Sequence, residues 1–302
     1  MRRLAPLLLL ALLAGCGGGG GGEATLSRHA RFDAQRAFRD LRAQVRIGPR
    51  PTASRASRRE VRLIANRLQG AGLRGVIVQR PYRNVVARIP GRAPGTVVVG
   101  AHHDTKGIPG FVGANDGASG VAVLLELARD LPRRLRGPSL DLVFFDAEEA
   151  RGPSDGAAVF ARSGDRGSRQ FLRYARRGGA DGSPPLDEIR AMVLFDMVGD
   201  CALDIPREAN SDSGLYGAFG DAAEARSGGP APFAGATAPI LDDHSPFLKA
   251  GIPAVDLIDF DYGPGATPGA FWHTHRDNLR HVCARSLGAV GKPALAALPT
   301  IR

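Results

Sequence analysis

The chain has 302 residues, which is enough for one large α/β domain or two small ones. Hydrophobic residues make up 43% of it, a share that allows a sizeable core and argues against intrinsic disorder. Forty basic and thirty acidic residues give a net charge of +10, yet the basic residues form no tract with interleaved aromatics, so we expect no nucleic-acid binding.

The N-terminus has the pattern of an export signal. Two arginines precede an apolar run, residues 4–13, which is too short to span a bilayer. The run ends in Leu-Ala-Gly-Cys at Cys16, which resembles a bacterial lipobox. We predict a lipoprotein signal peptide over residues 1–16, a Gly-rich linker over 17–31 and a membrane anchor at Cys16, facing the periplasm or the cell surface. The alternative is an ordinary signal peptide with an incidental cysteine.

The rest of the chain, residues 32–302, has the pattern of one catalytic domain. Helical spacing of apolar residues marks 32–45 and 54–68, with a Gly-Pro-Arg-Pro break between them, and a further helix is predicted over 120–131. Strand-like runs cover 75–79, 84–89, 96–101, 140–145, 191–195 and 254–258. The segments 151–168 and 204–238, rich in Gly, Ala, Pro and Asp, are predicted as loops over the site.

This order of elements predicts the class of fold. Strands alternating with helices indicate an α/β protein: a single three-layer domain with a mixed, mostly parallel sheet and helices on both faces. Cys201 and Cys283 could form a disulfide in an oxidising compartment or remain two buried thiols, and the sequence leaves both open. We expect a monomer.

Acidic and histidine clusters follow the predicted strands or begin the next helix. They are His102-His103-Asp104, Asn115-Asp116, Asp146-Ala147-Glu148-Glu149, Asp196 and Trp272-His273. The carboxyl ends of parallel strands meet at one edge of a sheet, so these side chains should be neighbours in space.

Carboxylates brought together repel one another and need compensation, which a divalent metal usually provides. Carboxylate and imidazole ligands without thiolate suit a catalytic zinc. In the adjacent pair Glu148-Glu149, one carboxylate can bind the metal while the other remains free for proton transfer. His103 and His275 flank the candidate ligands and are expected to support them, whereas His29 and His281 are expected to face solvent.

The ordered motifs resemble those of the zinc aminopeptidase clan of co-catalytic α/β exopeptidases, with its phosphorylase/hydrolase-like fold. Within this clan the chain is most similar to the animal-type glutaminyl-peptide cyclotransferases, which close N-terminal Gln into pyroglutamate and release ammonia. The similar stretches are Gly48-Pro49-Arg50, residues 111–116, residues 144–149, Gly167-Ser168-Arg169, residues 242–248, Gly251-Ile252-Pro253 and Trp272-His273-Thr274.

The resemblance implies a role for each matching position. Asp116, Glu149 and His273 would be the zinc ligands, and Glu148 the general acid/base. Asp196 and Asp243 would form a hydrogen-bonded acidic network with Glu148, and Trp272 would line the substrate pocket. His102 and Asp196 stand where the aminopeptidases bind a second zinc, so one zinc is expected and two are possible.

The chain also departs from the family pattern, and other functions remain open. His103 stands where Tyr or Leu is common, residues 151–166 share little with the family, and residues 256–271 are longer and rich in Gly and Pro. The runner-up is a two-zinc aminopeptidase of the same clan. A third possibility is a catalytically idle envelope lipoprotein that keeps the fold for binding. The expected substrates are the N-termini of peptides or proteins.

Overall fold

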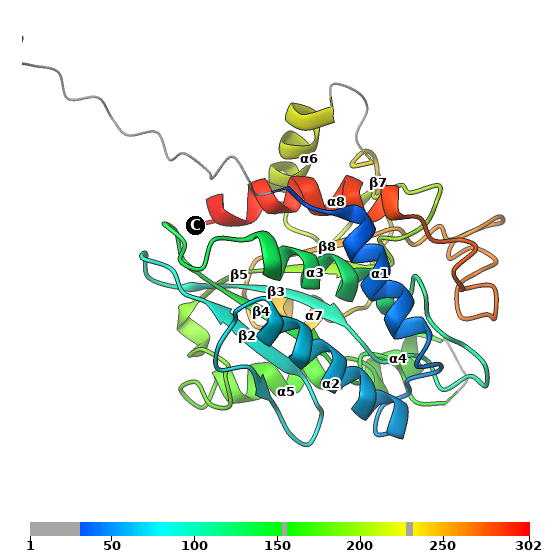
Figure 1. Cartoon of the computed structure of the whole chain (residues 1–302), viewed down its shortest axis with the longest axis horizontal. Helices are drawn as coiled ribbons and strands as arrows, with labels where there is room; N and C mark the ends of the chain where they lie inside the picture. Colours follow the sequence, from blue (N-terminus) through cyan, green and yellow to red (C-terminus); the bar gives the residue numbers. More distant parts are fainter. Residues whose placement is uncertain (1–30, 153–155, 228–231) are drawn as a thin grey trace, which may run out of the picture. The chain divides into compact units, whose positions relative to one another are not determined.

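The computed structural model describes residues 31–152, 156–227 and 232–302. A six-stranded sheet forms the centre of the domain. Its strand order is β1-β2-β4-β3-β5-β8, and Figure 1 shows it between layers of helices. The strands are β1 (Ile77–Val78), β2 (Val85–Ile89), β4 (Ser139–Phe145), β3 (Thr96–His102), β5 (Ile189–Asp196) and β8 (Ala254–Ile258). The last four run parallel, and β1 and β2 are antiparallel additions, which confirms the mixed, mostly parallel sheet.

Helices cover both faces of the sheet, as expected. On one side, α3 (Ala118–Asp130) packs on β3 and β5, with α1 (Ala34–Val45), α6 (Ser213–Ser227) and α8 (Ala284–Ala297) around it. On the other side lie α5 (Arg166–Ala175) and α7 (Ser245–Lys249), whereas α2 (Arg55–Gly70) touches both α3 and β2. The starts of α1 and α2 are capped, because Asp33 and Ser54 accept backbone N–H groups of Arg36 and Ser57, each at 2.9 Å.

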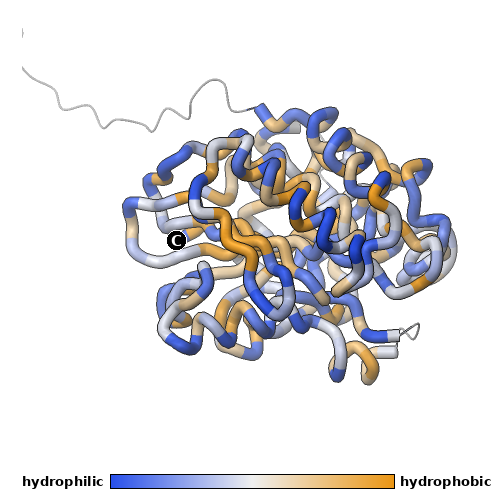
Figure 2. The backbone as a smooth tube through the Cα atoms, turned by 60° about the horizontal axis from the view of Figure 1, so that its bottom comes forward, coloured by the Kyte–Doolittle hydropathy of each residue, from blue (hydrophilic) through white to orange (hydrophobic). Residues whose placement is uncertain are grey.

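The core explains why the apolar runs became central strands. Phe145 of β4 meets Phe171 of α5 and Phe247 of α7 at ring-centroid distances of 6.2 and 6.3 Å. Every residue of β3 is buried, as expected for a parallel strand covered on both faces. In Figure 2 the apolar segments run through the interior and hydrophilic stretches alternate along the outer helices.

Two of the predicted loops were wrong in part. The first contains α4 (Ala157–Ser163) and the start of α5, and the second contains the whole of α6. The helix α4 has no buried residue, and nearly half of α6 is Ala or Gly, so neither carries an apolar stripe that a periodicity could reveal. The short parallel pair β6 (Arg207–Glu208) and β7 (Ala236–Thr237) also lies in the second segment.

The two cysteines whose pairing the sequence did not decide form a disulfide. A disulfide joins Cys201, in the segment after β5, to Cys283, which precedes α8. It therefore ties the chain just beyond Asp196 to the last helix. Among the described residues, no helix is long and apolar enough to cross a membrane. The predicted signal peptide and almost all of the linker, including His29, lie outside the described residues.

Candidate active site

The predicted metal ligands come together at the carboxyl edge of the sheet. Asp116 lies in the loop before α3, Glu149 follows β4, and His273 lies beyond β8. Nε2 of His273 is 3.2 Å from Oδ2 of Asp116 and 3.4 Å from Oε2 of Glu149. One ligand atom from each residue fits within a group no wider than 4.8 Å, so the three can hold a single ion.

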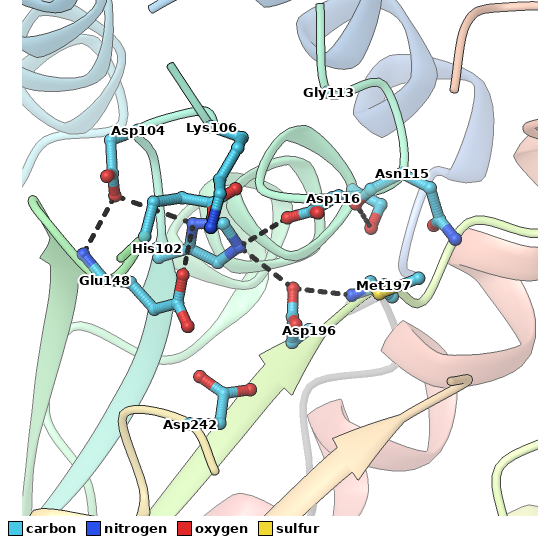
Figure 3. Close-up of polar contacts among 12 residues, drawn as sticks. His102, Asp104, Lys106, Gly113, Asn115, Asp116, Glu148, Asp196, Met197 and Asp242 are labelled. Carbon is cyan, nitrogen blue, oxygen red and sulfur yellow. Dashed lines mark hydrogen bonds and ion pairs between the residues drawn. The ribbon is translucent and has the colours of Figure 1, made fainter. Parts of the chain in front are cut away.

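A second group of the same kind shares Asp116. Nε2 of His102 lies 3.1 Å from Oδ1 of Asp116 and 3.1 Å from Oδ1 of Asp196 (Figure 3). Burial lowers the pKa of His102, but the carboxylates around it, Asp196 foremost, raise it well above its ordinary value. Asp116 is thus shared by the two groups, each of which could hold a metal ion.

The loop that presents Asp116 is held by groups far away in the sequence. Asp277 accepts the backbone N–H groups of Asn115 at 2.7 Å and of Asp116 at 3.0 Å. The fully buried Arg50 donates to the carbonyl oxygens of Val112 and Gly113 at 2.8 and 3.2 Å. These contacts fix the loop before any metal binds.

The glycine that follows Asp116 has no room for a side chain. Gly117 has a φ of 93°, and a Cβ there would lie 2.8 Å from the carbonyl oxygen of Asp104 and 3.1 Å from the ring of His102. Only glycine adopts this conformation at low cost. Its small size lets the Asp116 loop approach β3 and its terminal histidine.

Three other site residues adopt a left-handed backbone without being glycine. Ala147, just before the Glu pair, has a φ of 63°, Met197 after Asp196 has 47°, and His273 itself has 51°. Such conformations are costly for ordinary residues and concentrate at functional sites. The imidazole of His273 stacks on the indole of Trp272 at 3.8 Å between ring centres, which stabilises its orientation.

Glu148 lies beside the predicted metal ligands without belonging to either group. Its backbone N–H donates to Asp104 at 3.1 Å, and its Oε2 is 3.9 Å from Nδ1 of His102. Burial raises the pKa of Glu148 well above its usual value, and the negative charges of Glu149 and Asp243 add to this effect. A carboxyl group with a raised pKa is suited to exchanging protons near neutral pH.

The expected network of Glu148 with Asp196 and Asp243 takes a different form. Asp196 accepts hydrogen bonds from His102 and from the backbone of Met197, at 3.1 and 2.8 Å, rather than joining Glu148. Asp242, which the sequence analysis passed over, extends towards Glu148 and Asp196 (Figure 3) and lines the pocket. Its neighbour Asp243 is fully buried and is not among the lining residues.

A cavity of about 310 Å³ opens over these groups. Its polar floor consists of Lys106, Asp116, Glu148, Glu149, Asp196, Asp242 and His273. Its walls are apolar and include Phe160 of α4, Ile240, Leu241, Phe260 and Trp272. The size is at the lower end for ligand pockets, so it suits one small residue or side chain with its flat group against Trp272.

The other histidines considered in the sequence analysis differ in burial and in their contacts. His103 is fully buried with Nε2 3.2 Å from the carbonyl oxygen of Arg83, and His275 is exposed with Nε2 2.7 Å from that of Pro109. The expectation for His281 was wrong, because it is half-buried and stacks on Phe271 at 4.0 Å. A buried lysine was also missed: Nζ of Lys106 is 3.7 Å from Glu149.

A mostly parallel sheet with a buried carboxylate–histidine site at its carboxyl edge defines the class of the zinc exopeptidase-like α/β proteins. Residues 84–298 match the model of peptidase family M28. The chain therefore belongs to that family.

Its similarities point to one branch of the family. It is 28% identical over 250 residues to the glutaminyl-peptide cyclotransferase of Boiga irregularis, covering 70% of this chain and 64% of that protein. The chain thus spans slightly less than two thirds of the curated relatives it matches first.

Two solved structures match almost along their whole length. The glutaminyl cyclase of an Acidobacteriales bacterium has a TM-score of 0.78 and 31% identity, covering 94% of this chain and 99% of that one. The glutaminyl cyclase of Porphyromonas gingivalis has a TM-score of 0.73 and 30% identity, covering 88% and 98%.

Proposed function

We propose that this chain is a zinc-dependent glutaminyl-peptide cyclotransferase, which converts the N-terminal Gln of peptides to pyroglutamate and releases ammonia. The observation that carries the proposal is the position of Glu148, which lies beside the group of Asp116, Glu149 and His273 without being part of it. Glu148 lines a small pocket that Trp272 also lines. The similarity to bacterial glutaminyl cyclases along nearly the whole chain supports it.

The donor set fits zinc. Oε1 of Glu149 is buried without a hydrogen-bond partner, and an unsatisfied buried carboxylate oxygen is costly unless a cation is present. All three residues of this group line the pocket, whereas His102 of the second group does not. Zinc held by Asp116, Glu149 and His273 would supply a Lewis acid for the side-chain carbonyl of the substrate Gln.

The residues of the chain then have separate tasks. Glu148 accepts a proton from the substrate α-amine, whose nitrogen forms a bond to the side-chain carbonyl carbon. The bond from that carbon to the amide nitrogen breaks, and Glu148 returns the proton to the departing ammonia. Asp242 and Asp196 line the pocket together with Glu148, and Trp272 packs on the planar side chain of the substrate and excludes water.

The proton-transfer role has a direct test. Glu148→Gln keeps the size of the side chain but removes its ability to accept a proton, so turnover should fall by at least about 100-fold while zinc stays bound. Metal content by mass spectrometry and ammonia release are the two measurements. Activity close to that of the wild type would contradict this role.

The second candidate is a two-zinc aminopeptidase, favoured by the second group of His102, Asp116 and Asp196. A side-by-side assay separates the two functions. The cyclotransferase should release ammonia from a Gln-initiated peptide and leave a Leu-initiated peptide intact. Hydrolysis of the Leu peptide without ammonia release from the Gln peptide would favour the aminopeptidase, and inertness towards both would favour a binding lipoprotein.

The proposed location is the cell envelope, through a lipid on Cys16. The lipobox-like sequence and the disulfide between Cys201 and Cys283 support export to an oxidising compartment. Growth with a labelled fatty acid should label the wild-type chain and not the Cys16→Ser variant. Equal labelling of the two would reject the anchor.

A further inference from the structure

A buried histidine lies directly behind the acidic floor of the pocket. His244 follows Asp242 and Asp243 at the start of α7 and is fully buried. Nε2 of its ring lies 3.4 Å from Oε2 of Glu208 on β6, and Nδ1 lies 3.6 Å from Oδ2 of Asp256 on β8. Each ring nitrogen therefore faces a different carboxylate, and each carboxylate comes from a different strand.

Hydrogen bonds hold the carboxylate of Glu208 and the backbone of Asp256 in place. Glu208 is fully buried and accepts the N–H groups of Asn210 at 3.0 Å and Ile240 at 3.1 Å and the hydroxyl of Ser211 at 2.9 Å. The same hydroxyl accepts the backbone N–H of Asp256 at 2.9 Å. The histidine thus sits in a frame that joins β6 to β8.

Asp242 connects the residues around His244 to the pocket. After burial, the charge of Asp256 is the largest cause that raises the pKa of Asp242, so the two carboxyl groups are near neighbours. One oxygen of Asp242 accepts the backbone N–H of Asp243 at 2.6 Å, and the other is buried without a hydrogen-bond partner. This second oxygen belongs to the carboxyl group that extends towards Glu148 and Asp196 in Figure 3.

We propose that His244, clamped between Glu208 and Asp256, is a positioning residue that holds Asp242 in place beside Glu148. The inference rests on the proposed function, because Asp242 acts on the reaction only through Glu148. Removing the imidazole takes away the contacts of His244 with Glu208 and Asp256, which hold the turn of residues 242–245 against β6 and β8. Asp242 then turns away from Glu148, while the zinc ligands, which lie on other loops, keep their places.

A double-mutant cycle tests this coupling. His244→Leu, Asp242→Asn and the double variant are compared for kcat and KM in ammonia release from a Gln peptide, together with zinc content. His244→Leu should lower kcat about tenfold or more with little change in KM or zinc. Because it acts through Asp242, it should cause little further loss in the Asp242→Asn background. His244→Gln, which keeps a polar group in the frame, should recover part of the activity.

Phe247→Leu is the matched control. Phe247 is an equally buried side chain on the same helix α7, and it faces the core cluster with Phe145 and Phe171. This variant should lose stability and keep kcat. Losses from His244→Leu and Asp242→Asn that multiply in the double variant, or zinc loss in His244→Leu, would overturn the inference.

Crystal structures supply a readout that does not depend on activity. In the wild type the carboxyl group of Asp242 should face Glu148, and in His244→Leu, or in His244→Ala if the first variant does not fold, it should be displaced. An unchanged Asp242 would reject the inference. A wild-type protein that releases no ammonia would reject the proposed function, and the crystal structures would still decide the role of His244.

Discussion

Oδ1 of Asp116 lies 3.1 Å from Nε2 of His102, so one carboxylate joins the metal-ligand group to the histidine at the end of β3. Its other oxygen, Oδ2, faces His273 at 3.2 Å. Although burial raises it, hydrogen bonds from the two histidines hold the pKa of Asp116 below its usual value. Asp116 therefore stays ionised and is available to one cation or to two.

Zinc stoichiometry should follow the group that lines the pocket. We expect one tightly bound zinc per wild-type chain. His273→Ala should lower zinc affinity by more than about 100-fold, because it removes a direct ligand, whereas His102→Gln should keep one zinc. His275→Gln is the control, since His275 is exposed and contacts a backbone carbonyl. Two zincs in the wild type that fall to one in His102→Gln would indicate the aminopeptidase arrangement.

Asp242 and Asp243 should differ in their effect on activity. Asp242 extends into the pocket, so Asp242→Asn should lower kcat/KM by about 100-fold. Asp243 is fully buried and does not line the pocket, so Asp243→Asn should cost less than about tenfold. Steady-state kinetics of the two variants, with zinc content measured in parallel, checks the difference. The reverse order would restore Asp243 as the partner of Glu148.

The disulfide should stabilise the domain. It closes a long loop, with a sequence separation of 82 residues, so the unfolded chain loses entropy when it is formed. Cys201→Ala combined with Cys283→Ala should lower the free energy of unfolding by about 2–4 kcal/mol, and activity at low temperature should persist. Urea denaturation with and without reductant measures the effect. Identical midpoints in both conditions would show that the bond adds nothing.

The free energy of unfolding should decrease as pH rises, in part because of Glu60. Burial raises the pKa of Glu60 to about 7, against an opposing effect of Arg50. The folded state therefore binds more protons than the unfolded state between pH 4.5 and 7, and stability falls as pH rises through this range. Glu60→Gln should make this decline smaller by about 3 kcal/mol, and the part that remains comes from other buried carboxyl groups with raised pKa values, such as Asp165 and Asp277.

The measurement is the slope of unfolding free energy against pH, from urea titrations of the wild type and the variant under the same metal conditions. Glu188→Gln is the control, because Glu188 is exposed at the end of a 3-10 turn. Its slope should match that of the wild type. Parallel slopes for Glu60→Gln and the wild type would show that Glu60 does not titrate in this range.

The sequence by itself determined the fold class and brought the metal ligands together. Buried strands such as 96–101 and 191–195 are readable because apolar runs are a local property. Parallel strands end at one edge, so the groups after them, among them Glu149 and Asp196, could be placed near each other before any coordinates.

Only the tertiary structure decided which of two neighbouring side chains faces the pocket and which cysteines pair. Asp242 and Asp243 are equivalent in the sequence, and their directions depend on how the turn before α7 is anchored by His244. The pairing of Cys201 with Cys283 likewise joins residues far apart in the chain. Residue type and spacing are local, whereas side-chain direction and distant partners are set by packing, and no pattern along the chain encodes them.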